Sequence, residues 1–166
     1  MTQEQRPNIE TRAGQEQLRK MGLKPLPQPD ELTAPYWEAA QKHELHIQRC
    51  KRCAEYQHPP FDYCRKCDAS DLEWTRISGK GTVYSFIVDH RLLVPGFTEA
   101  YVVAQVNPVE AQTDLVRLTT NIRGCEPDAV YIGMPVEVLF EDVRDDTTLP
   151  QFKPLGDPLR GTPEAR

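Results

Sequence analysis

The sequence predicts a mainly β protein in two parts, a small cysteine-rich module followed by a small β-barrel. Two observations support this prediction. The first is a pair of Cys-x-x-Cys motifs with ten residues between them, beginning at residue 50. The second is a series of short runs of β-branched and aromatic residues after Leu72, separated by stretches that contain glycine and proline. Short strands with turns at such spacing are typical of all-β sandwiches and barrels.

The length of 166 residues suits one domain plus a small module, and we expect four segments. Residues 1–30 are polar and rich in proline, which favours a flexible or extended N-terminal arm with a short helix near Gln15–Lys20. Residues 31–75 are expected to form a helix and the cysteine-rich module, and residues 76–155 the barrel. Residues 156–166 are expected to fray.

The bulk composition argues against several classes of protein. The net charge of −5 disfavours a general nucleic-acid binder, which usually carries a basic excess. No apolar run approaches the roughly 20 residues that a membrane-spanning helix needs. The N-terminus, MTQEQRPNIE, lacks the apolar region of a secretory signal. Together with reduced cysteines, these features predict a cytoplasmic protein.

The cysteines Cys50, Cys53, Cys64 and Cys67 have the spacing of a structural zinc site. Each pair forms a tight turn that directs two thiolates to one point, and Zn²⁺ accepts four sulfurs in tetrahedral geometry. Because no coordination position stays open, the metal should stabilise the fold and do no chemistry. Disulfides are the alternative, but a fifth cysteine, Cys125, and the lack of a secretory signal argue against them. A thioredoxin-type dithiol is disfavoured because such proteins carry a single motif.

A helix is expected over residues 33–42, ahead of the first cysteine turn. Thr33 can cap this helix and Pro35 suits its first turn. The neighbouring aromatic residues Tyr36 and Trp37, with an alanine at helical spacing, give it an apolar face for packing or docking.

A strand over residues 44–49 is expected to lead into the first cysteine turn, and residues 57–63 to return as the second ribbon strand. His46 and His58 lie near the metal in sequence, but with four cysteines already in place both are expected to be ordinary neighbours of the site. Trp74 is expected to pack the ribbon against the barrel.

Barrel strands are expected at residues 82–88, 101–106, 115–122 and 134–143, with residues 151–155 as a last apolar anchor. The short motif Gly79-x-Gly81 is interpreted as a bend into the first of these strands. The periodicity predicts a small closed or nearly closed barrel, and it does not by itself name the topology.

No group of residues has the spacing of a self-sufficient active site. Asp89 and His90 are adjacent, and adjacent residues on a strand point to opposite faces. Cys125 suits a nucleophile only if a histidine lies near it, and a buried structural thiol is the commoner case. Five acidic residues within 137–146 are expected to form a solvated edge. A free-standing enzyme using Cys125 or His90 is therefore the least favoured class.

Taken together, these stretches resemble the family known as domain of unknown function 35, an acyl-CoA-associated family that joins a rubredoxin-like zinc ribbon to an OB-fold barrel. The resemblance runs in the family's order over about residues 30–155. Glycine usually follows the second cysteine of each pair in this family, and Ala54 and Asp68 stand there in this chain. The matching stretches are Pro35-Tyr36-Trp37, Leu45 to Cys53, Pro59-Pro60 with Cys64-x-x-Cys67, Gly79 to Ser85, Tyr101 to Ala104, Ile132 to Val138, and Phe152-Lys153-Pro154.

The resemblance implies an accessory subunit that has no catalytic residues of its own. Such proteins pair with thiolase-fold enzymes, namely thiolases, acyltransferases and the lipid-transfer-protein-like aldolases of steroid side-chain breakdown, and their barrel is thought to face the acyl-CoA substrate. Arg52, Arg65 and Lys66 are then the candidates for attracting the CoA phosphates. The rival class is an OB-fold nucleic-acid binder, which predicts exposed aromatic residues within a basic groove.

Overall fold

The computed structural model describes residues 11–13, 24–91, 94, 96–111 and 113–156. The helix expected near Gln15–Lys20, most of the N-terminal arm and most of the tail lie outside the described residues. The described end of the arm, residues 24–30, has no helix or strand. It lies on the barrel, because Leu26 is buried and the Lys24 ammonium is 4.6 Å from the centre of the Phe97 ring.

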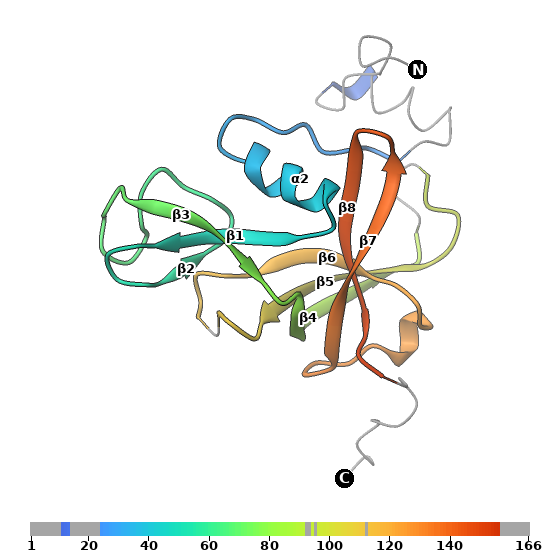
Figure 1. Ribbon diagram of the computed structural model, residues 1–166. Coiled ribbons are helices and arrows are strands. Elements are labelled where there is room, and N and C mark those ends of the chain that lie inside the picture. The colour runs from blue at the N-terminus through green and yellow to red at the C-terminus, as the bar shows by residue number, and fades with distance from the viewer. Residues whose placement is uncertain (1–10, 14–23, 92–93, 95, 112, 157–166) are drawn as a thin grey trace.

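The strands form two sheets, a ribbon and a closed barrel, which confirms the predicted mainly β class (Figure 1). The ribbon has the order β2-β1-β3, and in Figure 1 it projects to one side of the barrel. Its strands are Leu45–Cys50 (β1), Tyr56–Gln57 (β2) and Leu72–Ile77 (β3). The barrel strands are Lys80–Asp89 (β4), Tyr101–Pro108 (β5), Leu118–Ile122 (β6), Pro135–Arg144 (β7) and Thr147–Pro154 (β8).

The barrel has the strand order of an OB-fold, β4-β5-β6-β8-β7. Its first strand, β4, pairs antiparallel with both β5 and β7, so the sheet closes on itself. The third and fifth strands, β6 and β8, pair in parallel at Ile122 and Phe152. A short 3₁₀ turn, Pro127–Ala129 (η2), lies between β6 and β7.

Ribbon and barrel share one hydrophobic core. Alternate residues of β5 are buried, as expected for a strand that lines a barrel interior. The cluster built on these residues also includes ribbon side chains, among them Leu45, Ile47 and Ile77. The two parts are therefore packed together and do not form separate cores.

Helix α2, Ala34–Gln41, lies over the junction and contacts both β1 and β8 (Figure 1). The expectation that the Thr33 hydroxyl caps this helix is wrong. The backbone of Thr33 is already helical, whereas a capping side chain needs an extended backbone. Thr33 instead exchanges hydrogen bonds with Asp30, whose carboxylate accepts from the Thr33 N–H at 2.8 Å.

The expectation that residues 57–63 form the second ribbon strand also needs correction. Between the two cysteine turns, Tyr56 and Gln57 are the residues that pair with β1. The strand that pairs along the whole length of β1 is β3. Pro59 and Pro60 explain the difference, because proline has no N–H to continue a ladder.

The sequence does not predict the fifth barrel strand, β8. It predicts only an apolar anchor at residues 151–155, yet residues 147–154 pair along β7. Residues 147–154 contain two prolines and several polar residues, so their composition does not indicate a strand. The strand forms because these residues pair with β7. The acidic stretch beside it is also more than a solvated edge, because Asp142 accepts hydrogen bonds from His43 at 3.0 Å and Thr148 at 2.7 Å.

Candidate metal centre

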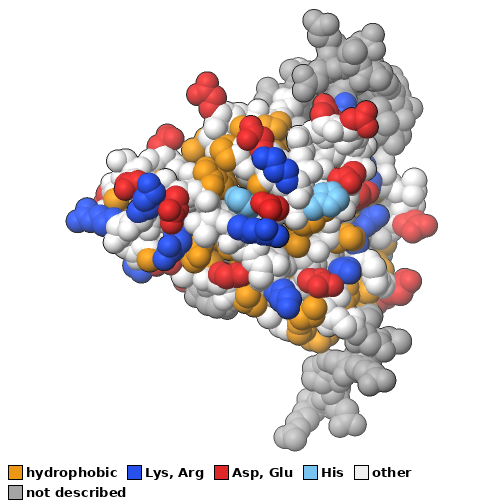
Figure 2. Space-filling model, in the orientation of Figure 1, with side chains coloured by type: hydrophobic (Ala, Val, Ile, Leu, Met, Phe, Trp, Pro, Cys, Tyr) orange, Lys and Arg blue, Asp and Glu red, His pale blue; other side chains and the backbone are white. Residues whose placement is uncertain are grey.

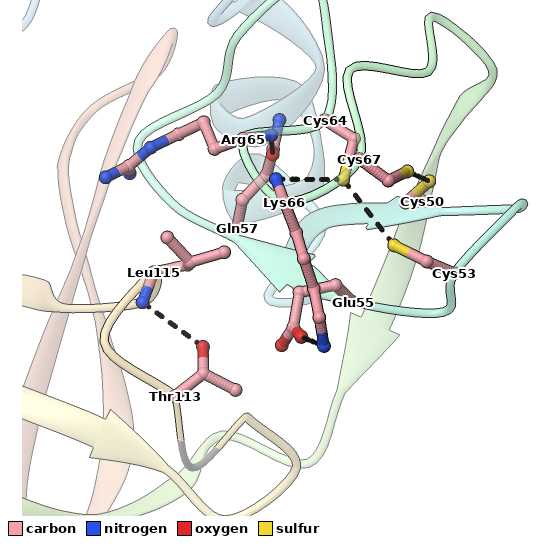
Figure 3. A network of polar contacts seen from close by, with 10 residues as sticks. All are labelled: Cys50, Cys53, Glu55, Gln57, Cys64, Arg65, Lys66, Cys67, Thr113 and Leu115. Carbon is pink, nitrogen blue, oxygen red and sulfur yellow. Dashed lines mark hydrogen bonds and ion pairs between the residues drawn. The ribbon is translucent and has the colours of Figure 1, made fainter.

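The four predicted cysteines meet at one end of the ribbon (Figure 3). The Cys50 and Cys67 sulfurs are 3.7 Å apart, those of Cys53 and Cys64 are 3.6 Å apart, and all four lie within 4.8 Å of one another. A tetrahedron with Zn–S bonds of about 2.3 Å has edges of about 3.8 Å. Two of the sulfur–sulfur distances match this edge and all four sulfurs are close enough together to share one zinc ion.

The two cysteine turns are built alike. In the first, the Ala54 N–H donates to the Cys50 carbonyl and the Cys50 N–H donates to the Glu55 carbonyl, both at 2.8 Å. The second repeats this pattern between residues 64 and 69, with distances of 2.9 Å and 2.8 Å. Each pair of bonds closes the loop around its sulfurs, so both turns present two thiols in the same way.

Each turn ends on a residue in the left-handed region. Ala54 has φ of 59° and Asp68 has φ of 58°. L-residues adopt this conformation at a cost, which is why glycine is usual at such positions. The turns keep their tight form without glycine, and the strain falls on these two residues.

The surroundings of the sulfurs lower the thiol pKa at Cys50 and raise it at Cys53. The backbone N–H groups of Cys53 and Arg52 donate to the Cys50 sulfur and lower the pKa of that thiol to about 7. At Cys53, the N–H of Glu55 lowers the pKa, but burial and the neighbouring thiols outweigh it and raise the pKa to about 12. A dication placed among the sulfurs removes this competition, since metal binding displaces thiol protons.

Three basic side chains around the cysteine motifs are paired with acids. Lys66 pairs with Glu55, Lys51 with Asp71 at 2.9 Å, and Arg49 with Glu73 at 3.4 Å. Figure 2 shows the same mixture of both signs at the ribbon end of the molecule. These acids come from outside the Cys-x-x-Cys motifs, which is why the motifs by themselves suggest a basic patch.

The three candidates for binding CoA phosphates therefore have different surroundings. Lys66 is held by Glu55 across the two cysteine turns (Figure 3). Arg65 lies 5.1 Å from the centre of the Phe61 ring, and both Arg65 and Arg52 are exposed. Of the three, the two arginines keep cationic groups directed at solvent.

The two histidines near the motifs do not join the sulfurs. Among the described residues, the only group of three or more potential metal ligands is the four cysteines. The His46 Nε2 lies 2.9 Å from the Glu44 carboxylate. His58 packs against the Tyr36 ring at 5.3 Å between ring centres, and burial lowers the pKa of its imidazole to about 4.

The remaining candidates for catalytic residues are Asp89, His90 and Cys125. Asp89 accepts hydrogen bonds from the Tyr101 hydroxyl at 3.1 Å and the Arg91 N–H at 2.8 Å, which order the start of the β4–β5 loop. His90 is exposed. Cys125 packs against the core cluster, and burial raises the pKa of its thiol.

The charge of the barrel segment disfavours a nucleic-acid binder, which usually carries a basic excess. Acidic side chains outnumber basic ones over residues 76–155. Arg117, which lies 4.2 Å from the centre of the exposed Tyr84 ring, is engaged by the Thr113 carbonyl and the Asp114 carboxylate. No described helix has both the length and the apolar character needed to cross a bilayer.

A four-cysteine ribbon joined to a five-stranded OB barrel defines the class of the chain as a zinc-ribbon OB-fold protein. Family models agree with this class, the ChsH2 rubredoxin-like zinc ribbon domain over residues 37–73 and the ChsH2 C-terminal OB-fold domain over residues 74–141. The chain belongs to this ChsH2, or DUF35, family.

One solved relative matches along almost its whole length. It is described as an Ltp2-ChsH2(DUF35) aldolase, and the match has a TM-score of 0.70 and 39% identity over 77% of this chain and 98% of that one.

Two curated relatives are longer than this chain. A probable enoyl-CoA hydratase alpha subunit of Thermomonospora curvata is 38% identical over 84% of this chain and 43% of its own length. A 3-oxo-4,17-pregnadiene-20-carboxyl-CoA hydratase alpha subunit of Mycobacterium tuberculosis is 37% identical over 68% of this chain and 35% of its own length. The chain thus spans less than half the length of either.

Proposed function

We propose that the chain is a non-catalytic, zinc-stabilised subunit that pairs with a thiolase-fold enzyme and helps to bind its acyl-CoA substrate. The observation that carries this proposal is the match over 98% of a chain in a structure described as an Ltp2-ChsH2(DUF35) aldolase. The partner would be a thiolase, an acyltransferase or a lipid-transfer-protein-like aldolase that cleaves steroid side chains.

The names of the two hydratase relatives support an acyl-CoA substrate for the complex. The name of the second relative includes a steroid acyl-CoA, 3-oxo-4,17-pregnadiene-20-carboxyl-CoA. Arg52 and Arg65 are the residues of the ribbon most suited to attract CoA phosphates, because both are exposed cations. Lys66 would contribute only if it left Glu55.

Cys50, Cys53, Cys64 and Cys67 would hold one structural Zn²⁺ per chain. The sulfur spacing supports this assignment, and four thiolates leave no position for substrate or water. None of the five cysteines forms a disulfide, which fits the reducing cytoplasm in which we expect the protein to act.

Purification of the tagged chain from its native host, with mass spectrometry of what copurifies, tests the proposal. We expect a thiolase-fold subunit in stoichiometric amount, and turnover of a member of an acyl-CoA panel by the complex but not by the chain alone. Copurified nucleic acid, or turnover by the isolated chain, would overturn it.

A further inference from the structure

Two glutamine side chains are buried inside the ribbon beside the cysteine turns. Gln48 on β1 is 5% exposed and Gln57 on β2 is 1% exposed, and the two residues are partners in the β1–β2 ladder. A buried amide is costly unless its donors and acceptors are satisfied. Such a pair therefore needs a structural reason, and its hydrogen bonds provide one.

The amide of Gln57 reaches the second cysteine turn directly (Figure 3). Its Oε1 accepts from the Arg65 N–H at 2.9 Å, and Arg65 follows Cys64. Its Nε2 donates to the Tyr63 carbonyl, the residue before Cys64, at 3.0 Å. The backbone on both sides of Cys64 is thus held by one side chain.

Gln48 orients that side chain. Its Oε1 accepts from the Gln57 Nε2 and from the Phe61 N–H, each at 2.9 Å. The opposite orientation of the Gln57 amide would place its Nε2 against the Arg65 N–H, so the network selects one orientation. Together the two amides bind the chain at three backbone points between residues 61 and 65.

The two turns differ in what supports them from outside. Cys50 is the last residue of β1, so strand pairing with β3 already places the first turn. The second turn lies in no strand, since β2 ends at Gln57 and β3 begins at Leu72. Its internal bonds close the loop but do not set its position relative to the first turn. The Lys66–Glu55 ion pair also links the two turns, but the Lys66 side chain is exposed, and exposed ion pairs contribute little.

We propose that Gln57, oriented by Gln48, is the residue that positions the second cysteine turn for the metal. It holds the Cys64 backbone at the distance from β1 at which all four sulfurs share one centre. Gln57 is a positioning residue and touches no ligand, and residues that orient metal ligands from behind commonly change metal affinity 10- to 100-fold when replaced. This inference rests on the zinc site of the proposed function.

The test compares Gln57→Leu with Gln151→Leu in the full chain. Gln151 is also a glutamine that is 5% exposed, but it lies on β8 and donates to Glu141, so its replacement removes a buried amide away from the sulfurs. The readouts are the rate at which zinc passes to a chromophoric chelator and the absorption spectrum of the Co²⁺-loaded protein. We expect Gln57→Leu to release zinc about 10-fold faster or more and to shift the Co²⁺ bands. Gln151→Leu should match the unaltered chain in both.

Equal release rates and spectra for Gln57→Leu and the unaltered chain would overturn the inference. If Gln57→Leu does not fold, Gln48→Met takes its place, because it removes the orienting amide and leaves the bond from Arg65. It should release zinc faster than the unaltered chain, and a rate equal to it would again overturn the inference. An unaltered chain that binds no metal would instead contradict the proposed zinc site itself.

Discussion

At the scale of single residues, the site depends on backbone geometry that the cysteines do not supply. Ala54 and Asp68 each close a turn with positive φ, and an alanine in that region carries about 1–2 kcal/mol of steric strain. Ala69 occupies the next position of the second turn and has no positive φ, so it offers a matched comparison.

Ala54→Gly should raise the stability of the metal-loaded protein by about 0.5–1 kcal/mol, because the strain relieved exceeds the entropy that glycine adds to the unfolded chain. Ala69→Gly should lower stability by a similar amount, since only the entropy changes. Thermal unfolding of the two variants measures the difference. A loss of stability in Ala54→Gly would show that the left-handed alanine is not strained.

At the scale of elements, β4 passes close to β5 at Gly81, the same part of β4 that pairs with β7 to close the barrel. A Cβ placed on Gly81 would meet the Asn107 carbonyl oxygen and a Val106 methyl, both at 2.6 Å. The backbone of β5 cannot move aside as a flexible side chain could, so a larger residue does not fit at this position. Glycine is required here because space is lacking, and not because the backbone has a positive φ.

Gly81→Ala should therefore destabilise the protein by about 1–3 kcal/mol, the usual cost of an overpacked contact. The shift in urea midpoint measures it. Gly156→Ala is the comparison, since a Cβ there meets nothing and only backbone strain at its positive φ is added. A Gly81→Ala midpoint equal to that of the unaltered chain would place β4 and β5 farther apart than described.

The end of α2 is attached to the barrel through Asp142. The Thr148 hydroxyl and the His43 imidazole donate to its carboxylate and lower its pKa. A carboxyl whose folded pKa is depressed stabilises the protein above its unfolded pKa of about 3.9, and this contribution is lost as the pH falls toward the folded value.

Asp142→Asn should therefore remove part of the loss of stability seen below about pH 4, where the unaltered carboxyl begins to take up a proton. Unfolding midpoints measured across this pH range report the change. Asp145→Asn, which replaces an exposed carboxylate on the same hairpin, is the comparison variant.

At the scale of the whole molecule, the segment after β2 links the ribbon to the connection between β5 and β6. The His58 N–H donates to the Leu115 carbonyl at 3.0 Å, and His58 forms a parallel bridge with Val116 of the barrel. His58 follows Gln57, whose amide holds the second cysteine turn. Two consecutive residues, Gln57 and His58, thus contact the second cysteine turn and the β5–β6 connection respectively.

Cys50→Ser should unfold the ribbon, because structural zinc contributes about 10–16 kcal/mol of apparent binding free energy to folding. Near-UV circular dichroism and the zinc content of the purified chain measure the effect. Cys125→Ser should retain the full zinc content, since Cys125 is not among the four clustered thiols. A Cys50→Ser protein that keeps its near-UV signal and its partner would show that the zinc is not structural.

The class of site and the kind of fold follow from local features of the sequence. Ligand type and Cys-x-x-Cys spacing are local properties, and runs of β-branched and aromatic residues identify strands such as β4 and β5 without knowledge of their partners. For the same reason the helix at residues 34–41 could be located from its proline and aromatic residues.

Only the tertiary structure decided the features that depend on residues distant in the chain. β8 is polar and contains prolines, so its identity as a strand comes from pairing with β7. Three of the basic residues around the cysteine motifs are paired with Glu55, Asp71 and Glu73. The buried amides of Gln48 and Gln57 are satisfied only once the second turn packs over them. Each of these depends on side chains brought together across space, and a single sequence does not specify which residues will meet.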